Sequence, residues 1–206
     1  MVPAKPHIPV ECGGIGKNLT AMNLSISAPI TNARPVSTIT TPRLVLRPLR
    51  LGDADLLRAY TSDRRLAEGT RSIPHPLPQG AAEEFIARAL ADQRDEDVWA
   101  LDGEAQGSVS LMGVVSLKPL DRGQSQIGYW VAPAFWNSGL ASEAVRALIA
   151  ANPHGSRTLF AEVFQDNPVS ARILTNAGFE YIGDAEAFSV ARERSVPTWT
   201  YLRRMD

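Results

Sequence analysis

Short runs of apolar and β-branched residues occupy the middle of the chain, and turn signals separate them, which predicts strands. Residues 43–49 alternate leucines with basic residues, and residues 109–117 and 124–131 form longer β-rich runs. The sequences Asp102-Gly103 and Asp121-Arg122-Gly123 supply turns between these runs. Further strands are predicted at residues 98–101, 158–164, 179–182 and 198–202.

Apolar residues at helical spacing predict helices around these strands. In residues 139–151 the apolar positions follow steps of three and one, which makes a buried stripe. Pro78 suits the first turn of another helix, whose apolar residues extend to Leu90. Residues 168–177 form a third helix, and a short one follows Leu51-Gly52-Asp53. This arrangement predicts an α/β (α+β) fold with a mixed central sheet flanked by helices.

Residues 1–37 differ in composition from the rest of the chain. Five prolines and three closely spaced glycines interrupt them, and no period of 2 or 3.6 is sustained. We therefore expect an extended or disordered N-terminal tail, followed by one folded domain over residues 38–206. Met22 is a second candidate for the biological start.

Composition and charge narrow the classes of function. The 206 residues fit one domain plus a tail, and a hydrophobic content of 44% provides a sizeable core. The net charge of -1 gives no global electrostatic reason to bind nucleic acid or an anionic membrane, and no run is apolar enough to cross a bilayer. The single cysteine, Cys12, excludes an intramolecular disulfide framework and a multi-cysteine zinc site, and no other metal-ligand spacing occurs. We expect a cytoplasmic protein without a metal.

Residues 127–144 join a strand, a tight loop and a helix. The strand ends at Pro133, the loop ends at Gly139, and the helix begins there. Backbone N–H groups in the first turn of a helix lack intrahelical partners and lie at the positive end of the helix dipole. A small residue at that point lets a phosphate approach the backbone. The same residues also fit an ordinary strand–turn–helix connection in which glycine supplies a positive φ.

A second element, residues 166–179, reads as a helix with clear ends. Asn167 suits the N-cap, Pro168 the first helical position and Gly178 the stop. These residues alone are consistent with any helix. Their order and spacing relative to residues 127–144 carry more information than either element alone.

Together these motifs resemble the GNAT superfamily of acetyltransferases, and within it the branch of the ribosomal-protein N-terminal alanine acetyltransferases. The likeness covers residues 39–206. Its motifs are Thr41-Pro42-Arg43-Leu44-Val45-Leu46-Arg47, the strand Ile127-Gly128-Tyr129-Trp130-Val131, the loop 136–141 with Glu143, and the Asn167-x-x-Ser170 helix that ends in Gly178-Phe179.

The resemblance implies a mostly antiparallel sheet in which two parallel strands splay apart to form an acetyl-CoA cleft. These strands would be the one ending at Val131 and the one ending near Phe164. The Val131 backbone would pair with the pantetheine arm, the loop and helix start would hold the pyrophosphate, and Asn167 would face the pantetheine or the thioester. The implied cofactor-binding residues are Val131, Trp136, Asn137, Ser138, Gly139, Leu140, Ala141 and Asn167.

The catalytic groups are less clear than the cofactor site. The oxyanion needs a donor and the leaving thiolate benefits from a proton. Many relatives use a tyrosine in the last helix, but this chain has Leu174 there, so Ser170 is the candidate acid; its alternative role is to support the first helical turn. No general base is identified, because Gln126 stands where this branch often has Glu. Glu143 is a candidate catalytic residue, or it stabilises the helix and holds the loop backbone.

The acceptor is predicted to be a primary amine. An α-amino group, with a pKa of about 7.7–8.0, is far more often neutral at pH 7 than a lysine side chain, with a pKa of about 10.4. A site without a base therefore favours a protein N-terminus or a small-metabolite amine. The acidic residues between Asp92 and Glu104 either attract a cationic acceptor or form a solvated rim. Alternatives are acetylation of an antibiotic or polyamine, and a non-catalytic acyl-CoA sensor; the chain is expected to be a monomer or homodimer.

Overall fold

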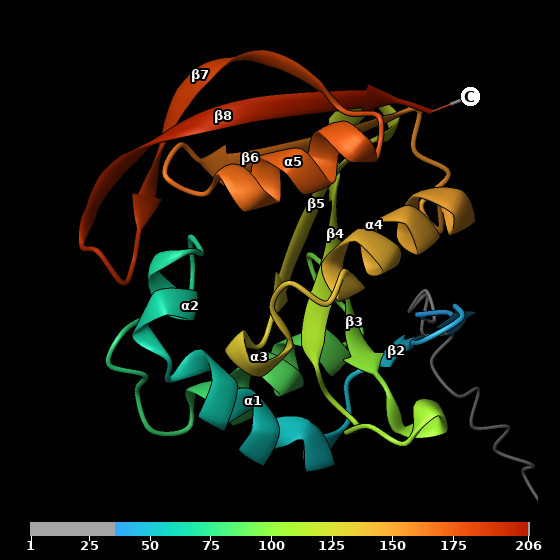
Figure 1. Cartoon of the computed structure of the whole chain (residues 1–206), viewed down its shortest axis with the longest axis vertical. Coiled ribbons are helices and arrows are strands. Elements are labelled where there is room, and N and C mark those ends of the chain that lie inside the picture. Colours follow the sequence, from blue (N-terminus) through green and yellow to red (C-terminus); the bar gives the residue numbers. More distant parts are fainter. Residues whose placement is uncertain (1–35, 206) are drawn as a thin grey trace, which may run out of the picture. The chain divides into compact units, whose positions relative to one another are not determined.

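The computed structural model describes residues 36–205, which form one eight-stranded sheet with helices on both faces (Figure 1). The tail predicted over residues 1–37 lies almost wholly outside these residues. The strands are β1 (Ile39–Thr40), β2 (Val45–Pro48), β3 (Asp97–Asp102), β4 (Gly113–Leu120), β5 (Gln124–Val131), β6 (Thr158–Phe164), β7 (Glu180–Ser189) and β8 (Arg194–Arg204). The α-helices are α1 (Ala54–Thr61), α2 (Arg64–Glu68), α3 (Ala81–Leu90), α4 (Leu140–Ala151) and α5 (Pro168–Asn176).

The strands follow the order β1-β2-β3-β4-β5-β6-β8-β7 across the sheet. Every neighbouring pair is antiparallel except β5 and β6, which are parallel. The parallel pair is joined through α4, because a parallel connection needs a crossover rather than a tight turn. The prediction of a mixed, mostly antiparallel sheet flanked by helices is therefore confirmed.

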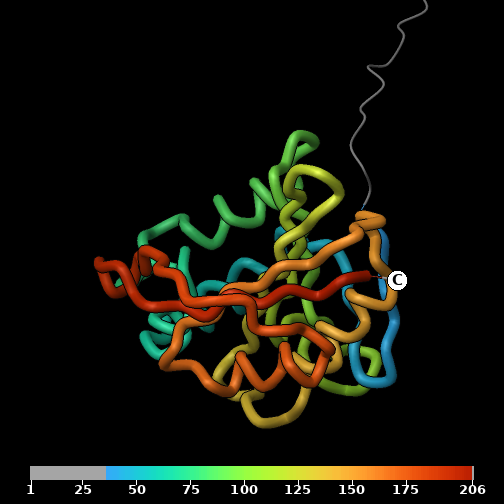
Figure 2. Tube along the Cα trace, turned by 90° about the horizontal axis from the view of Figure 1, so that it is seen from above, coloured from blue at the N-terminus to red at the C-terminus, as the bar shows by residue number. Residues whose placement is uncertain are grey.

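Each face of the sheet has its own apolar core. Along β3 the side chains alternate, so Trp99 and Leu101 pack in the core beneath α4 and α5, whereas Val98 and Ala100 pack beneath α1 and α3. Viewed from above, α5 and α3 lie on opposite sides of the C-terminal strand β8 (Figure 2). The two helical layers thus bury both faces of the middle of the sheet.

Most predicted elements are confirmed, and the differences have local causes. The strand predicted from residue 109 starts at Gly113, where a side-chain Cβ would lie 2.4 Å from the Trp130 carbonyl oxygen. The helix predicted from Pro78 starts at Ala81, after Gly80 with a φ of +80°. Helix α2 was not predicted, because five residues are too few to display a helical period. The final two strands are longer than predicted.

A buried arginine on β2 forms ion pairs with two buried carboxylates. Arg47 on β2 forms ion pairs with Asp53 (Nη2 to Oδ1, 2.8 Å) and Asp102 (Nε to Oδ2, 2.5 Å), and all three residues are buried. Burial lowers the pKa of Arg47, but the hydrogen bonds that Arg47 donates to both carboxylates outweigh it and raise that pKa. Asp102 is therefore not part of a solvated rim, because it closes β3 against Arg47.

Candidate active site

The parallel strands β5 and β6 part after a short contact. They pair only where residues 124–126 meet residues 158–160. Beyond this contact β5 stays paired with β4 as far as Val131, and β6 stays paired with β8 as far as Phe164. The two strands diverge because each follows its antiparallel neighbour on the other side. The predicted splay between the strands ending at Val131 and Phe164 is present.

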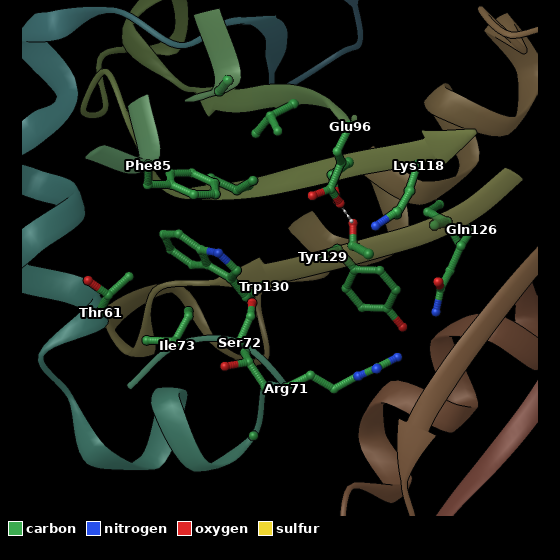
Figure 3. A pocket seen from close by; sticks show the side chains of 18 of the residues that line it. Thr61, Arg71, Ser72, Ile73, Phe85, Glu96, Lys118, Gln126, Tyr129 and Trp130 are labelled. Atoms are coloured by element: carbon green, nitrogen blue, oxygen red, sulfur yellow. Dashed lines mark hydrogen bonds between the residues drawn. The ribbon is translucent and has the colours of Figure 1, made fainter. Parts of the chain in front are cut away.

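A cavity of about 1050 Å³ lies at this opening. Its lining includes the consecutive β5 residues Gln126 to Trp130 and the β6 residues Ala161 to Phe164. Successive side chains of a strand point to opposite faces of the sheet. A cavity lined by consecutive residues of β5 therefore reaches both faces, as Figure 3 shows for Tyr129 and Trp130. Two reactants could meet here from opposite sides of the sheet.

The N-terminus of α4 follows directly from the free end of β5. A 3₁₀ turn (Pro133–Phe135) and a tight loop lead to Gly139, whose φ of +80° suits glycine, and Asn137 also has a positive φ of +60°. No side chain caps α4, and its first intrahelical bond runs from the Glu143 N–H to the Gly139 carbonyl. Within residues 36–205, the N–H groups of Leu140 and Ala141 therefore have no acceptor. This loop has the properties of an anion site.

Arg43 and Glu143 brace the loop. The Glu143 carboxylate accepts hydrogen bonds from Thr41 Oγ1 (2.6 Å), the Arg43 N–H (2.9 Å) and Arg43 Nε (2.6 Å), and Arg43 Nη1 donates to the Ser138 carbonyl (2.8 Å). Burial raises the pKa of Glu143, but the hydrogen bonds from Thr41 and Arg43 outweigh it and lower that pKa. Glu143 does not line the cavity. Its position favours the loop-holding role over the catalytic one.

Trp136 contacts the edge of β5 where the pantetheine arm is predicted to lie. Its indole Nε1 donates to the Val131 carbonyl (2.7 Å), and the Arg65 guanidinium stacks 5.3 Å from the ring centroid. A carbonyl oxygen has two lone pairs, so a cofactor N–H would share the Val131 oxygen with Trp136 or replace the indole.

Tyr129 and Ser170 form a reciprocal pair between β5 and α5. Ser170 Oγ donates to the Tyr129 hydroxyl (2.8 Å), and that hydroxyl donates to the Ser170 carbonyl (3.0 Å). Burial raises the pKa of Tyr129 to about 12, with the Ser170 hydrogen bond opposing it. The phenol therefore stays protonated at neutral pH. Both residues line the cavity, as does the buried Leu174.

Asn167 connects this pair to the start of α5. Its Oδ1 accepts from the Ser170 N–H (3.1 Å), as predicted for an N-cap. Asn167 also lines the cavity, and its side-chain amide forms no other hydrogen bond with residues 36–205. The amide NH₂ group therefore has no acceptor among residues 36–205.

Sequence reasoning missed the role of Tyr129, although the residue was part of the matched strand motif. The only signal in the sequence was the residue type: a tyrosine with a polar hydroxyl lies in a strand whose side chains point alternately to the two faces of the sheet. His75 and His154 do not line the cavity. His154 is instead held by Ser125 (Nδ1 to Oγ, 2.9 Å) and Asp97 (Nε2 to Oδ2, 2.9 Å). In the described part of the chain, no group of three or more His, Cys, Asp or Glu residues could hold a metal ion, and no helix is long and apolar enough to cross a membrane.

Comparison with known proteins agrees with this geometry. The family model for the acetyltransferase (GNAT) domain matches residues 43–180. The uncharacterized N-acetyltransferase p20 of Bacillus licheniformis is 27% identical over 180 residues, which cover 81% of this chain and 95% of p20.

Two solved structures share the fold at lower identity. The microcin C7 self immunity acetyltransferase MccE, in complex with acetyl-CoA and AMP, has a TM-score of 0.69 and 17% identity, and the match covers 80% of this chain and 93% of MccE. RimL, the ribosomal L7/L12 α-N-protein acetyltransferase in complex with coenzyme A, has a TM-score of 0.69 and 19% identity, covering 82% of this chain and 99% of RimL.

Proposed function

Because this chain belongs to the GNAT acetyltransferase family, we propose that it transfers the acetyl group of acetyl-CoA to a primary amine, either the α-amine of a protein N-terminus or the amine of a small metabolite. The observation that carries the proposal is the open splay between β5 and β6. The splay opens beside a cavity that reaches both faces of the sheet, and the end of β5 leads on to the uncapped N-terminus of α4.

The residues present fit the cofactor. The N–H groups from Asn137 to Ala141 would hold the pyrophosphate at the positive end of α4, and the Arg43 guanidinium beside Ser138 adds positive charge to the loop. The edge of β5 at Val131 and the indole of Trp136 would contact the pantetheine arm. The side-chain amide of Asn167 would donate to that arm or to the thioester.

Bound acetyl-CoA supplies an activated acetyl thioester, and the hydroxyls of Ser170 and Tyr129 stabilise the negative charge that develops beside it. Tyr129 stays protonated at neutral pH because burial raises its pKa to about 12. Either hydroxyl would donate to developing oxygen or sulfur charge by exchanging its present hydrogen bond, to Tyr129 or to the Ser170 carbonyl, for one to the thioester, which is the electrostatic role that such donors perform in acyl transfer. Arg43 and Glu143 act indirectly, by holding the loop.

The nature of the acceptor follows from proton chemistry. The attacking nitrogen must lose a proton before it can form an amide bond. A protein α-amine loses it at a pH about two to three units lower than a lysine ε-amine. The proposed acceptor is for this reason an α-amine or another weakly basic primary amine.

A non-catalytic acyl-CoA sensor is the competing function, and two measurements separate the two. Calorimetry would detect acetyl-CoA binding, and a thiol-release assay would detect transfer to a peptide with a free N-terminal alanine, to spermidine, and to an N-terminally blocked peptide with one lysine. The enzyme is expected to release CoA only when an amine is present, and faster with the α-amine than with the lysine. Tight binding of acetyl-CoA with no amine-dependent release would support the sensor and overturn the proposal.

A further inference from the structure

Glu96 brings a carboxylate into the cavity from the α3 face of the sheet. It precedes β3, is half-buried and lines the cavity (Figure 3). Both neighbouring carboxylates are neutralised: Asp95 by Lys118 (3.3 Å), and Asp97 by Arg94 (2.6 Å) and by His154 (2.9 Å) when that ring is protonated. Glu96 forms no ion pair with any residue between 36 and 205. The acidic stretch is therefore not uniformly a solvated rim.

The Glu96 carboxylate lies beside Gly128 on β5. Gly128 lies opposite Ser116 in the β4–β5 ladder. A Cβ at position 128 would lie 3.0 Å from Ser116 Oγ and 4.0 Å from Glu96 Oε1. The Glu96 carboxylate is thus beside the strand, one residue from Tyr129, whose side chain points to the other face. Glu96, Tyr129 and Ser170 all line the same cavity, which lies at the splay between β5 and β6.

Other charged side chains also line this space. Glu84 and Arg88 project from α3 and are exposed, Arg71 pairs with Glu162 (2.6 Å), and Lys118 pairs with Asp95. Arg71 and Lys118 are thus already paired with other carboxylates. Glu96 is the half-buried carboxylate of the lining that lacks a cation of its own, which fits a cationic ligand group.

We propose that Glu96 binds the ammonium group of the acceptor and accepts its proton, so that the site takes primary amines in their cationic form. This inference rests on the proposed acetyltransferase function. It supplies the base that the sequence lacks at Gln126, and it places acceptor and cofactor on opposite faces of the sheet.

The proton and electron balance of the step is complete. The ammonium gives one proton to the Glu96 carboxylate, and the nitrogen lone pair then forms the N–C bond as the C–S bond breaks. The nitrogen loses a second proton, which goes to the departing thiolate to form CoA thiol. Glu96 releases its proton to solvent, so the sum is an amide, CoA thiol and one free proton.

Glu96→Gln tests the proposal, because it keeps the shape of the side chain and removes the charge. Asp92→Asn is the matched control: Asp92 belongs to the same acidic stretch but is exposed and does not line the cavity. With the best amine found for the wild-type protein, Glu96→Gln is expected to lower kcat/KM by about 10²-fold or more, which is typical for loss of a general base. Calorimetry should show an unchanged affinity for acetyl-CoA and weaker binding of the same amine in the presence of CoA.

The pH profile separates proton transfer from simple attraction. In Glu96→Gln only the neutral amine can react, so kcat/KM should rise about tenfold per pH unit up to the pKa of the amine. The wild-type protein, which takes the ammonium form, should show a smaller rise. Glu96→Asp should recover part of the activity.

Two results would overturn the inference. One is a Glu96→Gln variant within about twofold of the wild-type protein in kcat/KM and in amine binding; the other is a loss that Asp92→Asn reproduces. If the wild-type protein transfers acetyl to none of the amines, the proposed acetyltransferase function is wrong. The binding role of Glu96 is tested separately by calorimetry, and an affinity for the amine that is the same in Glu96→Gln and in the wild-type protein would refute it.

Discussion

The hydroxyl of Ser170 donates a 2.8 Å hydrogen bond to the phenol oxygen of Tyr129, and the phenol donates in return to the Ser170 carbonyl at 3.0 Å. The bond joins β5 to the first turn of α5 across the splay between β5 and β6. Both hydroxyls line the cavity in which the proposed function places the thioester. The position that many relatives fill with a helix tyrosine is Leu174 here, and a tyrosine from the strand reaches the helix instead.

This pair yields a prediction about turnover. Ser170→Ala and Tyr129→Phe are each expected to lower kcat by roughly 10²-fold, because each removes one donor to developing negative charge. The affinity for acetyl-CoA, measured by calorimetry, should change by less than about threefold. Thr175→Val, on the exposed side of α5 and bonded to the Arg172 carbonyl, is the control. Turnover that is undiminished in Ser170→Ala would remove the serine from the mechanism.

The raised pKa of Tyr129 makes a prediction about alkaline stability. Burial raises this pKa to about 12, above the ordinary value of about 10. The folded state therefore holds the proton more tightly than the unfolded state, so the contribution to stability is complete below pH 10 and is lost as the pH rises toward 12. Urea unfolding of the wild-type protein and Tyr129→Phe across this range should show a steeper decline for the wild-type protein. Parallel declines would contradict the assignment.

The brace between Arg43 and Glu143 predicts an effect on cofactor binding rather than on chemistry. Glu143→Gln removes the charge that holds Arg43 against the Ser138 carbonyl, so the KM for acetyl-CoA is expected to rise by about tenfold with kcat little changed. Glu83→Gln, which removes the exposed carboxylate that pairs with Arg58, is the control and should leave both constants unaltered. A fall in kcat at saturating acetyl-CoA, with KM unchanged, would instead restore Glu143 as a catalytic residue.

The buried Arg47 predicts a large effect on folding. Arg47→Met leaves the carboxylates of Asp53 and Asp102 buried without their cation, which should reduce the free energy of unfolding by about 3–5 kcal/mol. The triple variant that adds Asp53→Asn and Asp102→Asn should recover part of this loss, because no uncompensated charge remains. Urea unfolding of the three proteins checks this. Equal stability of the single variant and the wild-type protein would contradict the account.

Much of the fold could be predicted from the sequence, because the residues that mark the ends of its strands and helices lie next to those ends in the chain. Strand β5 has the predicted limits, Gln124–Val131, and α4 starts one residue after Gly139, because a turn before the strand and a positive-φ glycine before the helix mark these ends. The missing α2 and the displaced start of β4 left no such signal, because α2 is too short to display a helical period and the β-rich run does not mark where its strand begins. Gly113, for example, begins a strand where the Trp130 carbonyl leaves no room for a Cβ.

The site was less predictable because it depends on contacts between distant residues. Tyr129 and Ser170 are 41 positions apart, and their hydrogen bond joins β5 to α5 beyond the point where β5 and β6 stop pairing. The same holds for the acidic stretch. Residues 95–97 are three successive carboxylates that look alike in the sequence. In the structure Asp95 pairs with Lys118, and Asp97 pairs with Arg94 and His154, which leaves Glu96 as the different one.

The most direct test of the account compares two variants of the loop before α4 by calorimetric titration with acetyl-CoA. Asparagine and aspartate both tolerate the left-handed backbone at Gly139, where φ is +80°, and they differ only in charge. If the N-terminus of α4 holds the pyrophosphate, Gly139→Asp should weaken acetyl-CoA binding by more than about tenfold relative to Gly139→Asn, because its carboxylate adds negative charge to the loop and would pair with Arg43, whose Nη2 lies 3.5 Å from the Cβ position. Equal affinities of the two variants would contradict the placement of the cofactor at this helix.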